Sequence, residues 1–369
     1  MKYALLLFVC VSSLFLFDSC GNKDEGKYSK SEKKESVGLF PVTLAGKTGF
    51  INRDGKLIIN PQYDVAKNFS DGLALIMTNG KTGFIDKEGK NIINPQFDAA
   101  GDFSDGLSAV SLNGKWGYID KEGKYIVNPQ FDNVRNFSHG FAVVNTGGKS
   151  GFINKDGKTI INPQFDAARD FSSGLSAVSL GGKWGFIDKD GKYIINPQFD
   201  NVGNFSKDYA LISSGGKYGY IDKDGKNIIL AQFDAAGDFS DGLAAVTTGG
   251  KSGYIDKSGK FIINPQFDVA GDFSDGLAPV CISNKWGFID KSGKYIINPQ
   301  FDKVANFTGG FAVVSIAGKV GLIDKDGKYT INPQFDNMES FSDGLALISV
   351  GGKWGYIDKD GKYIWNPSN

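Results

Sequence analysis

The sequence predicts an all-β protein built as a tandem array of ten units of 34 residues. The first observation is a glycine, followed by a hydrophobic residue and isoleucine, that recurs every 34 residues at Gly49, Gly83, Gly117, Gly151, Gly185, Gly219, Gly253, Gly287, Gly321 and Gly355. The second is that each unit holds several glycines and β-favouring runs, with no apolar stripe at helical spacing. Tetratricopeptide helical hairpins share this period, but the composition excludes them.

One unit illustrates the predicted strands. Leu175 to Ser179 is a first strand, and the pair Gly181-Gly182 suits a tight hairpin into a second strand, Lys183 to Asp188. A further turn leads to a third strand, Tyr193 to Ile195. We expect Pro197 to end that strand, because proline cannot donate to a ladder. Each unit is therefore predicted to be a three-stranded antiparallel sheet.

The arrangement of the ten units follows from the ends of the array. A single unit buries too little surface to persist alone, so neighbours must pack together. The array starts with a first strand at 39–42 and stops with a third strand at 363–365, whereas a ring closed by mixing strands would usually break inside a unit. We therefore expect an open β-superhelix or solenoid. The alternatives are a closed propeller-like ring or two five-unit rings, which the identity of 140–144 and 310–314 supports.

The N-terminal residues have a composition of their own. A short positive start and the apolar run 4–17 are typical of a signal peptide, predicted over residues 1–19. We expect Cys20 to be lipidated and residues 20–38 to form a polar tether, which places the repeats, 39–369, at the bacterial cell envelope, lipid-anchored on the outer membrane or cell surface. An ordinary secretory signal or an uncleaved anchor are the alternatives. Cys281 is then the only remaining thiol, which excludes an intrachain disulfide.

Four units carry a recognisable box, Lys-Trp-Gly-aromatic-Ile-Asp, starting at Lys115, Lys183, Lys285 and Lys353. These boxes resemble the signature of the WG-repeat family, also called KWG repeats. The resemblance covers the chain from about Leu39 onward. It implies a bacterial protein of tandem β-repeats, often exported, and it implies architecture more than activity. Six units depart from the pattern at the tryptophan.

The sequence contains few residues that are typical of a catalytic, metal-binding or nucleic-acid-binding site. Forty-one basic and 41 acidic residues give no net charge and no basic stripe, so nucleic acid is not an expected partner. His139 is the only histidine and has no catalytic partners, so we expect a surface turn residue. Turns such as Asp188-Lys-Asp-Gly resemble the start of a calcium-binding loop, but they lack the further oxygen ligands that such a loop needs. We predict no catalytic residue, no metal and no cofactor, and a protein that is not an enzyme.

Recognition is the remaining function. We expect a non-enzymatic envelope lipoprotein that acts as a scaffold for protein–protein interaction or adhesion. The alternative is a carbohydrate-binding module that uses repeated aromatic and Asn/Asp side chains. Small residues replace tryptophan in some units, which a packed interior site would resist. The candidate ligand contacts are therefore Trp116, Trp184, Trp286 and Trp354.

Overall fold

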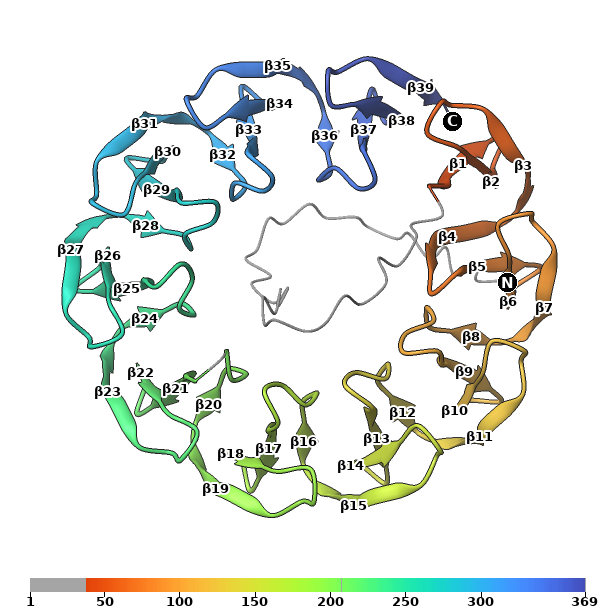
Figure 1. The fold of residues 1–369 in the computed structure, drawn as a ribbon, viewed down its shortest axis with the longest axis horizontal. Helices are drawn as coiled ribbons and strands as arrows, with labels where there is room; N and C mark the ends of the chain where they lie inside the picture. The colour runs from red at the N-terminus through yellow and green to blue at the C-terminus, as the bar shows by residue number, and fades with distance from the viewer. Residues whose placement is uncertain (1–37, 207, 369) are drawn as a thin grey trace, which may run out of the picture. The chain divides into compact units, whose positions relative to one another are not determined.

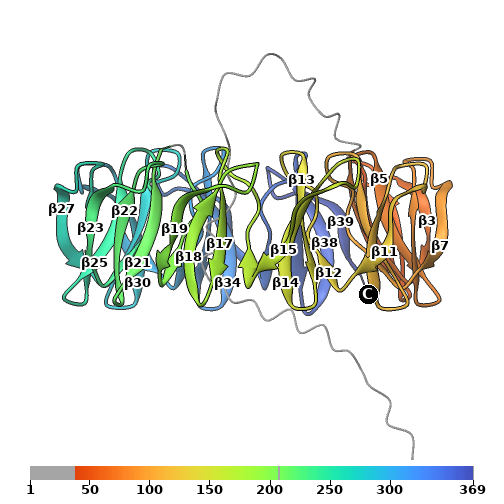
Figure 2. The ribbon, with the colours of Figure 1, turned by 90° about the horizontal axis from the view of Figure 1, so that it is seen from below.

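The computed structural model describes residues 38–206 and 208–368, and every regular element among them is a β-strand. The strands form ten small antiparallel sheets, the blades, which stand side by side around a closed ring (Figures 1 and 2). Nine blades have four strands. The first has three, β1-β2-β3. No helix in the described part of the chain has the length and hydropathy to cross a membrane.

Each blade runs from a short inner strand to a long outer one. The inner strands are β4 (Val65–Ser70), β8 (Ala99–Ala100), β12 (Asn133–Val134), β16 (Ala167–Ala168), β20 (Asn201–Val202), β24 (Ala235–Ala236), β28 (Val269–Ala270), β32 (Lys303–Val304) and β36 (Asn337–Met338). The second strands are β1 (Phe40–Leu44), β5 (Leu73–Thr78), β9 (Ser108–Leu112), β13 (Phe141–Thr146), β17 (Ser176–Leu180), β21 (Ala210–Ser214), β25 (Ala244–Thr248), β29 (Ala278–Ile282), β33 (Phe311–Ile316) and β37 (Leu345–Val350).

The two outer layers complete the blades. The third strands are β2 (Lys47–Ile51), β6 (Lys81–Ile85), β10 (Lys115–Ile119), β14 (Lys149–Asn154), β18 (Lys183–Ile187), β22 (Lys217–Ile221), β26 (Lys251–Ile255), β30 (Lys285–Ile289), β34 (Lys319–Asp324) and β38 (Lys353–Asp358). The outer strands are β3 (Leu57–Tyr63), β7 (Asn91–Phe97), β11 (Tyr125–Phe131), β15 (Thr159–Phe165), β19 (Tyr193–Phe199), β23 (Asn227–Phe233), β27 (Phe261–Phe267), β31 (Tyr295–Phe301), β35 (Tyr329–Phe335) and β39 (Tyr363–Ser368).

The predicted hairpins are present, but the unit has four strands rather than three. β19 continues through Pro197 to Phe199, because an outer edge strand needs no hydrogen-bond donor on its open side. A register shift between Trp184 and Phe186 marks a bulge in this ladder. At the bulge a Cβ on Gly185 would lie 2.4 Å from the Ile195 carbonyl oxygen. The recurring glycine therefore lets the bulged outer strand approach.

The hydrophobic core is divided among the seams between neighbouring blades. One cluster joins Phe84 and Ile93 of the second blade to Phe103, Val110 and Ile119 of the third. Equivalent clusters follow around the ring. As expected from the sequence, each unit packs against its neighbour. Phenylalanines such as Phe84 and Phe103 lie in these clusters, so each blade depends on the next one.

The open superhelix is wrong, and so are two five-unit rings. The last blade packs against the first: Phe40, Val42 and Ile51 form one buried cluster with Leu345 and Tyr356. Figure 1 shows β1 and β39 side by side. The ring closes through side-chain packing between whole blades, without a blade that mixes strands from both ends. The strand at which the repeat array starts and the strand at which it stops therefore do not predict whether the ring is closed.

Candidate functional site

Lysine and aspartate of the repeat join neighbouring blades. The Lys81 ammonium lies 2.6 Å from Asp98 Oδ1, and Asp98 Oδ2 accepts a 2.7 Å hydrogen bond from the backbone N–H of Asn113 in the next hairpin. The hydrogen bond from Lys81 is the main cause that lowers the pKa of Asp98. Nine such pairs recur in the described residues. These recurring charges are explained by blade-to-blade contacts.

A regular seam is also held by the inner segment of the following blade. Its phenylalanine packs on an aromatic ring of the preceding blade, as in the pair Phe84 and Phe103 with centroids 4.7 Å apart. Its carbonyl groups accept side-chain hydroxyls: Tyr118 donates to Arg135 O at 2.6 Å. Ser70 likewise donates to Phe103 O at 2.7 Å. The inner segment therefore contributes a ring and two acceptors.

The seam between the tenth and first blades is built differently, because the first blade has no inner strand in the described residues. Tyr356 occupies the position of Tyr118 but donates to Pro41 O of β1, at 3.1 Å. Phe40 fills the aromatic position with a centroid 5.5 Å from Tyr356. The nine other units have Ala or Ser at the position of Phe40. The side chain of Phe40 thus replaces the ring that an inner segment supplies elsewhere.

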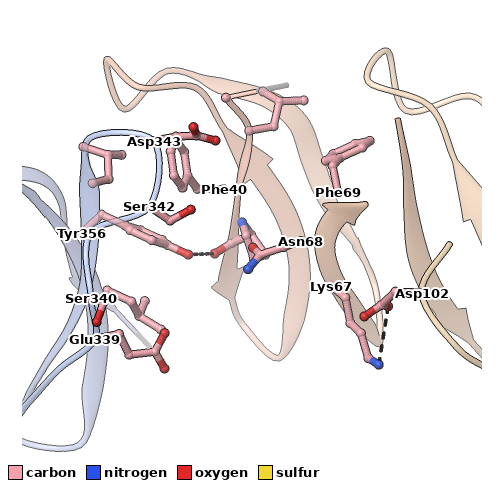
Figure 3. A pocket seen from close by; sticks show the side chains of 15 residues that line it. Phe40, Lys67, Asn68, Phe69, Asp102, Glu339, Ser340, Ser342, Asp343 and Tyr356 are labelled. Carbon is pink, nitrogen blue, oxygen red and sulfur yellow. Dashed lines mark hydrogen bonds and ion pairs between the residues drawn. The ribbon is translucent and has the colours of Figure 1, made fainter. Parts of the chain in front are cut away.

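Two hollows remain at this closing seam. One, of about 470 Å³, is lined by Phe40, Phe69, Ser342, Glu339 and their neighbours (Figure 3). The other, of about 550 Å³, is lined by residues that include Trp354 and Trp365. Pro41, Leu347 and Tyr356 line both hollows. The segment that contains β4 also contributes to each: residues 67–69 line the first hollow and residues 64–66 line the second. The hollows therefore follow the length of an inner strand, between the tenth blade and β4.

The charges around the first hollow of the closing seam form two ion pairs and leave one carboxylate. Lys67 pairs with Asp102 at 3.6 Å, and Arg53 pairs with Asp343 at 3.5 Å across the seam. The Glu339 carboxylate lines the first hollow and has no ion pair among the described residues. Burial raises the pKa of the Tyr356 phenol, and Glu339 adds to that effect, so the hydroxyl stays a hydrogen-bond donor. The Glu339 carboxylate is thus the charge at this end of the seam for which no salt bridge is found among the described residues.

The four candidate tryptophans lie one to a blade, in the third, fifth, eighth and tenth, and the structure does not bring them together. Trp116, Trp184 and Trp286 are half-buried against clusters between blades. The Arg169 guanidinium lies 4.7 Å above the Trp184 ring. Trp354 is 40% exposed and lines a hollow of the closing seam. Of the four, Trp354 is the most accessible.

The remaining candidates lie away from the closing seam. His139 is an exposed turn residue with φ of 53°, and its Nδ1 is 2.9 Å from the Ser138 hydroxyl. Asp188 uses Oδ1 to accept backbone N–H groups of its own turn. Among the described residues, no group of three or more His, Cys, Asp or Glu side chains could hold a metal ion. Cys281 is a buried free thiol, and Cys20 lies outside the described residues.

Solved structures with similar folds include other proteins of low sequence identity. The crystal structure of a eukaryotic initiation factor matches with a TM-score of 0.52 and 10% identity, over 88% of this chain and 94% of that chain. Kluyveromyces lactis Hsv2p has a TM-score of 0.38 and 11% identity, over 61% of this chain and 92% of that chain. PorZ of Porphyromonas gingivalis has a TM-score of 0.30 and 12% identity, over 69% and 44%. The first likeness supports the fold alone.

The sequence itself matches a family model. No curated protein shows a significant match to this chain. The model of the WG containing repeat matches nine times, at residues 49–81, 83–116, 116–149, 151–184, 184–218, 218–251, 253–286, 286–319 and 321–354. These matches cover most of the ring. The chain therefore belongs to the family of proteins with WG containing repeats.

Proposed function

We propose that this protein is a non-enzymatic scaffold that binds a partner protein at the bacterial cell envelope. The observation that carries the proposal is the closing seam, which has hollows of about 470 and 550 Å³, the second of them lined by the exposed Trp354. Concave sites with aromatic anchors and a polar rim are typical of recognition surfaces. The nine Lys–Asp pairs and the buried seams give this surface a fixed support.

A carbohydrate ligand is the second candidate. Trp354 and Trp365 line the same hollow as Asp64, which provides the aromatic and carboxylate groups that a sugar would contact. A row of equivalent tryptophans along the ring receives less support, because Trp184 lies beneath Arg169 and is half-buried. Any glycan site would therefore be local to the closing seam.

Site-specific photo-crosslinking in the native envelope tests the proposal. A photoreactive amino acid at position 354 of the full mature chain should give a discrete crosslinked band that protease removes. The same group at position 230 is the control, because Leu230 is 66% exposed on the outer strand β23, away from the seam. A band that resists protease and stains for sugar would favour the carbohydrate function. Equal crosslinking from both positions would count against a seam site.

Attachment through Cys20 is a separate part of the proposal and rests on the sequence alone. Two or more acyl chains are needed for stable anchoring, which lipoprotein processing supplies. Cells labelled with a fatty acid should incorporate label into the wild-type protein and not into a Cys20→Ser variant. The variant should also leave the membrane fraction. Equal labelling of both proteins would contradict a lipid on Cys20.

A further inference from the structure

We propose that the closing seam binds an extended peptide segment of a partner protein, which adds to β1 at the place where the nine other blades have an inner strand and the described residues of the first blade have none. This inference deepens the proposed function and rests on it. Adding a strand to an exposed sheet edge is an established mode of peptide recognition. The nine other blades show what such a segment must provide, since each has an inner strand in place.

The backbone of the segment would find its partners already in position. In blades with a tyrosine at the site of Tyr356, the hydroxyl donates to an inner-segment carbonyl, as Tyr220 does to Gly237 O at 2.6 Å. Ser342 occupies the site of Ser70 and Ser240. These two serine hydroxyls donate to an inner-segment carbonyl that lies two residues after the one that accepts the tyrosine hydroxyl. Ser342 lines the hollow. Both hydroxyls can therefore serve successive carbonyls on one side of an added strand.

Pro41 does not block this addition. In the eighth blade Pro279 holds the same position, and its carbonyl accepts a 2.8 Å hydrogen bond from the inner-segment N–H of Gly271. In the first blade the Pro41 carbonyl accepts the Tyr356 hydroxyl instead. On binding, Tyr356 would transfer its donor to a peptide carbonyl, and Pro41 O would accept a peptide N–H. No hydrogen-bonding group is lost in the exchange.

Two side chains of the segment follow from the neighbouring seams. Val202 packs in one cluster with Trp184, and Val304 packs in one cluster with Trp286, so the equivalent side chain on Trp354 should be apolar. Two residues after this apolar position, two inner segments carry an aspartate that forms an ion pair with a base of the preceding blade. The Asp102 carboxylate lies 3.6 Å from the Lys67 ammonium, and the Asp170 carboxylate lies 3.6 Å from the Arg135 guanidinium.

At the closing seam Glu339 takes the place of those bases, so the peptide should carry Lys or Arg there. Residues two apart in a strand share one face. The ligand is thus an extended apolar-x-basic segment.

The chain's own residues fit this pattern only in part. The register of the repeat aligns Glu32 with the apolar position and Lys34 with the basic one. A carboxylate placed on Trp354 would lose the apolar contact and would have to be desolvated. A partner segment with both features is therefore the better complement.

A short peptide series tests the inference on the full mature chain. The probe is the dye-labelled hexapeptide Asn-Val-Gly-Lys-Ser-Ser, and the two controls replace its Val or its Lys by Glu. We expect measurable binding by fluorescence anisotropy for the probe and a loss of at least about tenfold in affinity for each control. A Glu339→Lys protein should lose about tenfold for the probe and regain binding of the Lys→Glu peptide.

Matched protein variants separate the seam from the other blades. Trp354→Thr should weaken the probe severalfold, whereas Trp184→Thr should leave its affinity unchanged, because that seam already has its inner strand. Equal affinity for the three peptides, or no response to Glu339→Lys, would overturn the inference. Binding that emerges only when the residues before Gly38 are removed would show that the chain itself fills the seam, and would overturn it too. If crosslinking at position 354 still captures a protein, the scaffold function stands without strand addition.

Discussion

A regular seam and the closing seam perform the same task with different parts. In a regular seam the inner segment supplies a phenylalanine, as Phe103 does for Phe84, and carbonyls for the hydroxyls of the preceding blade. In the closing seam Phe40 supplies the ring from a neighbouring strand, and Tyr356 turns to Pro41. Among the described residues the ring therefore closes with no inner strand in the first blade, and two hollows lie at this seam. The difference teaches that, within the described residues, a change in how two blades pack leaves open space at their joint.

The largest effect should come from a methyl group placed in the closing seam. Gly55 and Gly123 hold equivalent turns with φ of 79° and 82°, so an alanine costs about 1 kcal/mol of backbone strain in each. At Gly55 the new Cβ would lie 2.3 Å from the Ile364 carbonyl oxygen, whereas at Gly123 it would lie 3.2 Å from a side-chain carbon of Ile93. We expect Gly55→Ala to cost about 2 kcal/mol more than Gly123→Ala, because the backbone must shift.

The measurement is urea unfolding combined with hydrogen exchange resolved by segment. Gly55→Ala should speed exchange in β1 and β39, which lie on the two sides of the closing seam, and Gly123→Ala should not. Equal losses of stability in the two variants, without faster exchange at the ends, would mean that the first and last blades are not in contact in solution.

Much of the blade could be predicted from the sequence, because its signals are local. The hairpin glycines and the 34-residue spacing gave the three longer strands. The inner strand escaped prediction because it has only two residues in most blades, such as Ala99–Ala100, which is too short for a periodic pattern. The extension of the outer strand through Pro197 depends on its place at an edge, and ring closure depends on the angle between blades. Neither is recorded in any short stretch of sequence.

The candidate site could be predicted only in part. The sequence predicts Trp354 as a ligand contact together with three other tryptophans, and nothing in the box of the repeat separates it from them. The closing seam is not among the sites that the sequence analysis predicts, although the sequence carries a signal for it: Phe40 stands where the nine other units have Ala or Ser. A large residue at a position that is otherwise small marks a changed packing environment. The role of all four tryptophans in ligand contact stays a prediction.

The smallest expected effect compares seams that have an inner ion pair with seams that lack one. In one seam the Arg135 guanidinium lies 3.6 Å from the Asp170 carboxylate. In another seam Gly237 takes the place of the arginine, and Asp272 lies opposite it: a Cβ added to Gly237 would lie 2.9 Å from Asp272 Oδ1. Burial, with a contribution from Asp238, raises the pKa of Asp272 to about 6. A carboxyl group whose pKa is higher in the folded state than in the unfolded state stabilises the fold below the unfolded pKa of about 4, and this contribution is lost as the pH rises through 6.

An Asp272→Asn variant should therefore be more stable than the wild type at pH 7, by on the order of 1 to 2 kcal/mol after discounting for partial exposure, and about equal to it at pH 4. Urea unfolding across this range is the measurement. Asp170→Asn is the matched control, and it should lose less than about 1 kcal/mol at pH 7, because it breaks a half-exposed ion pair. If Asp272→Asn destabilises the protein at pH 7 as Asp170→Asn does, Asp272 has a compensating partner in solution, and the contrast between the two kinds of seam does not hold.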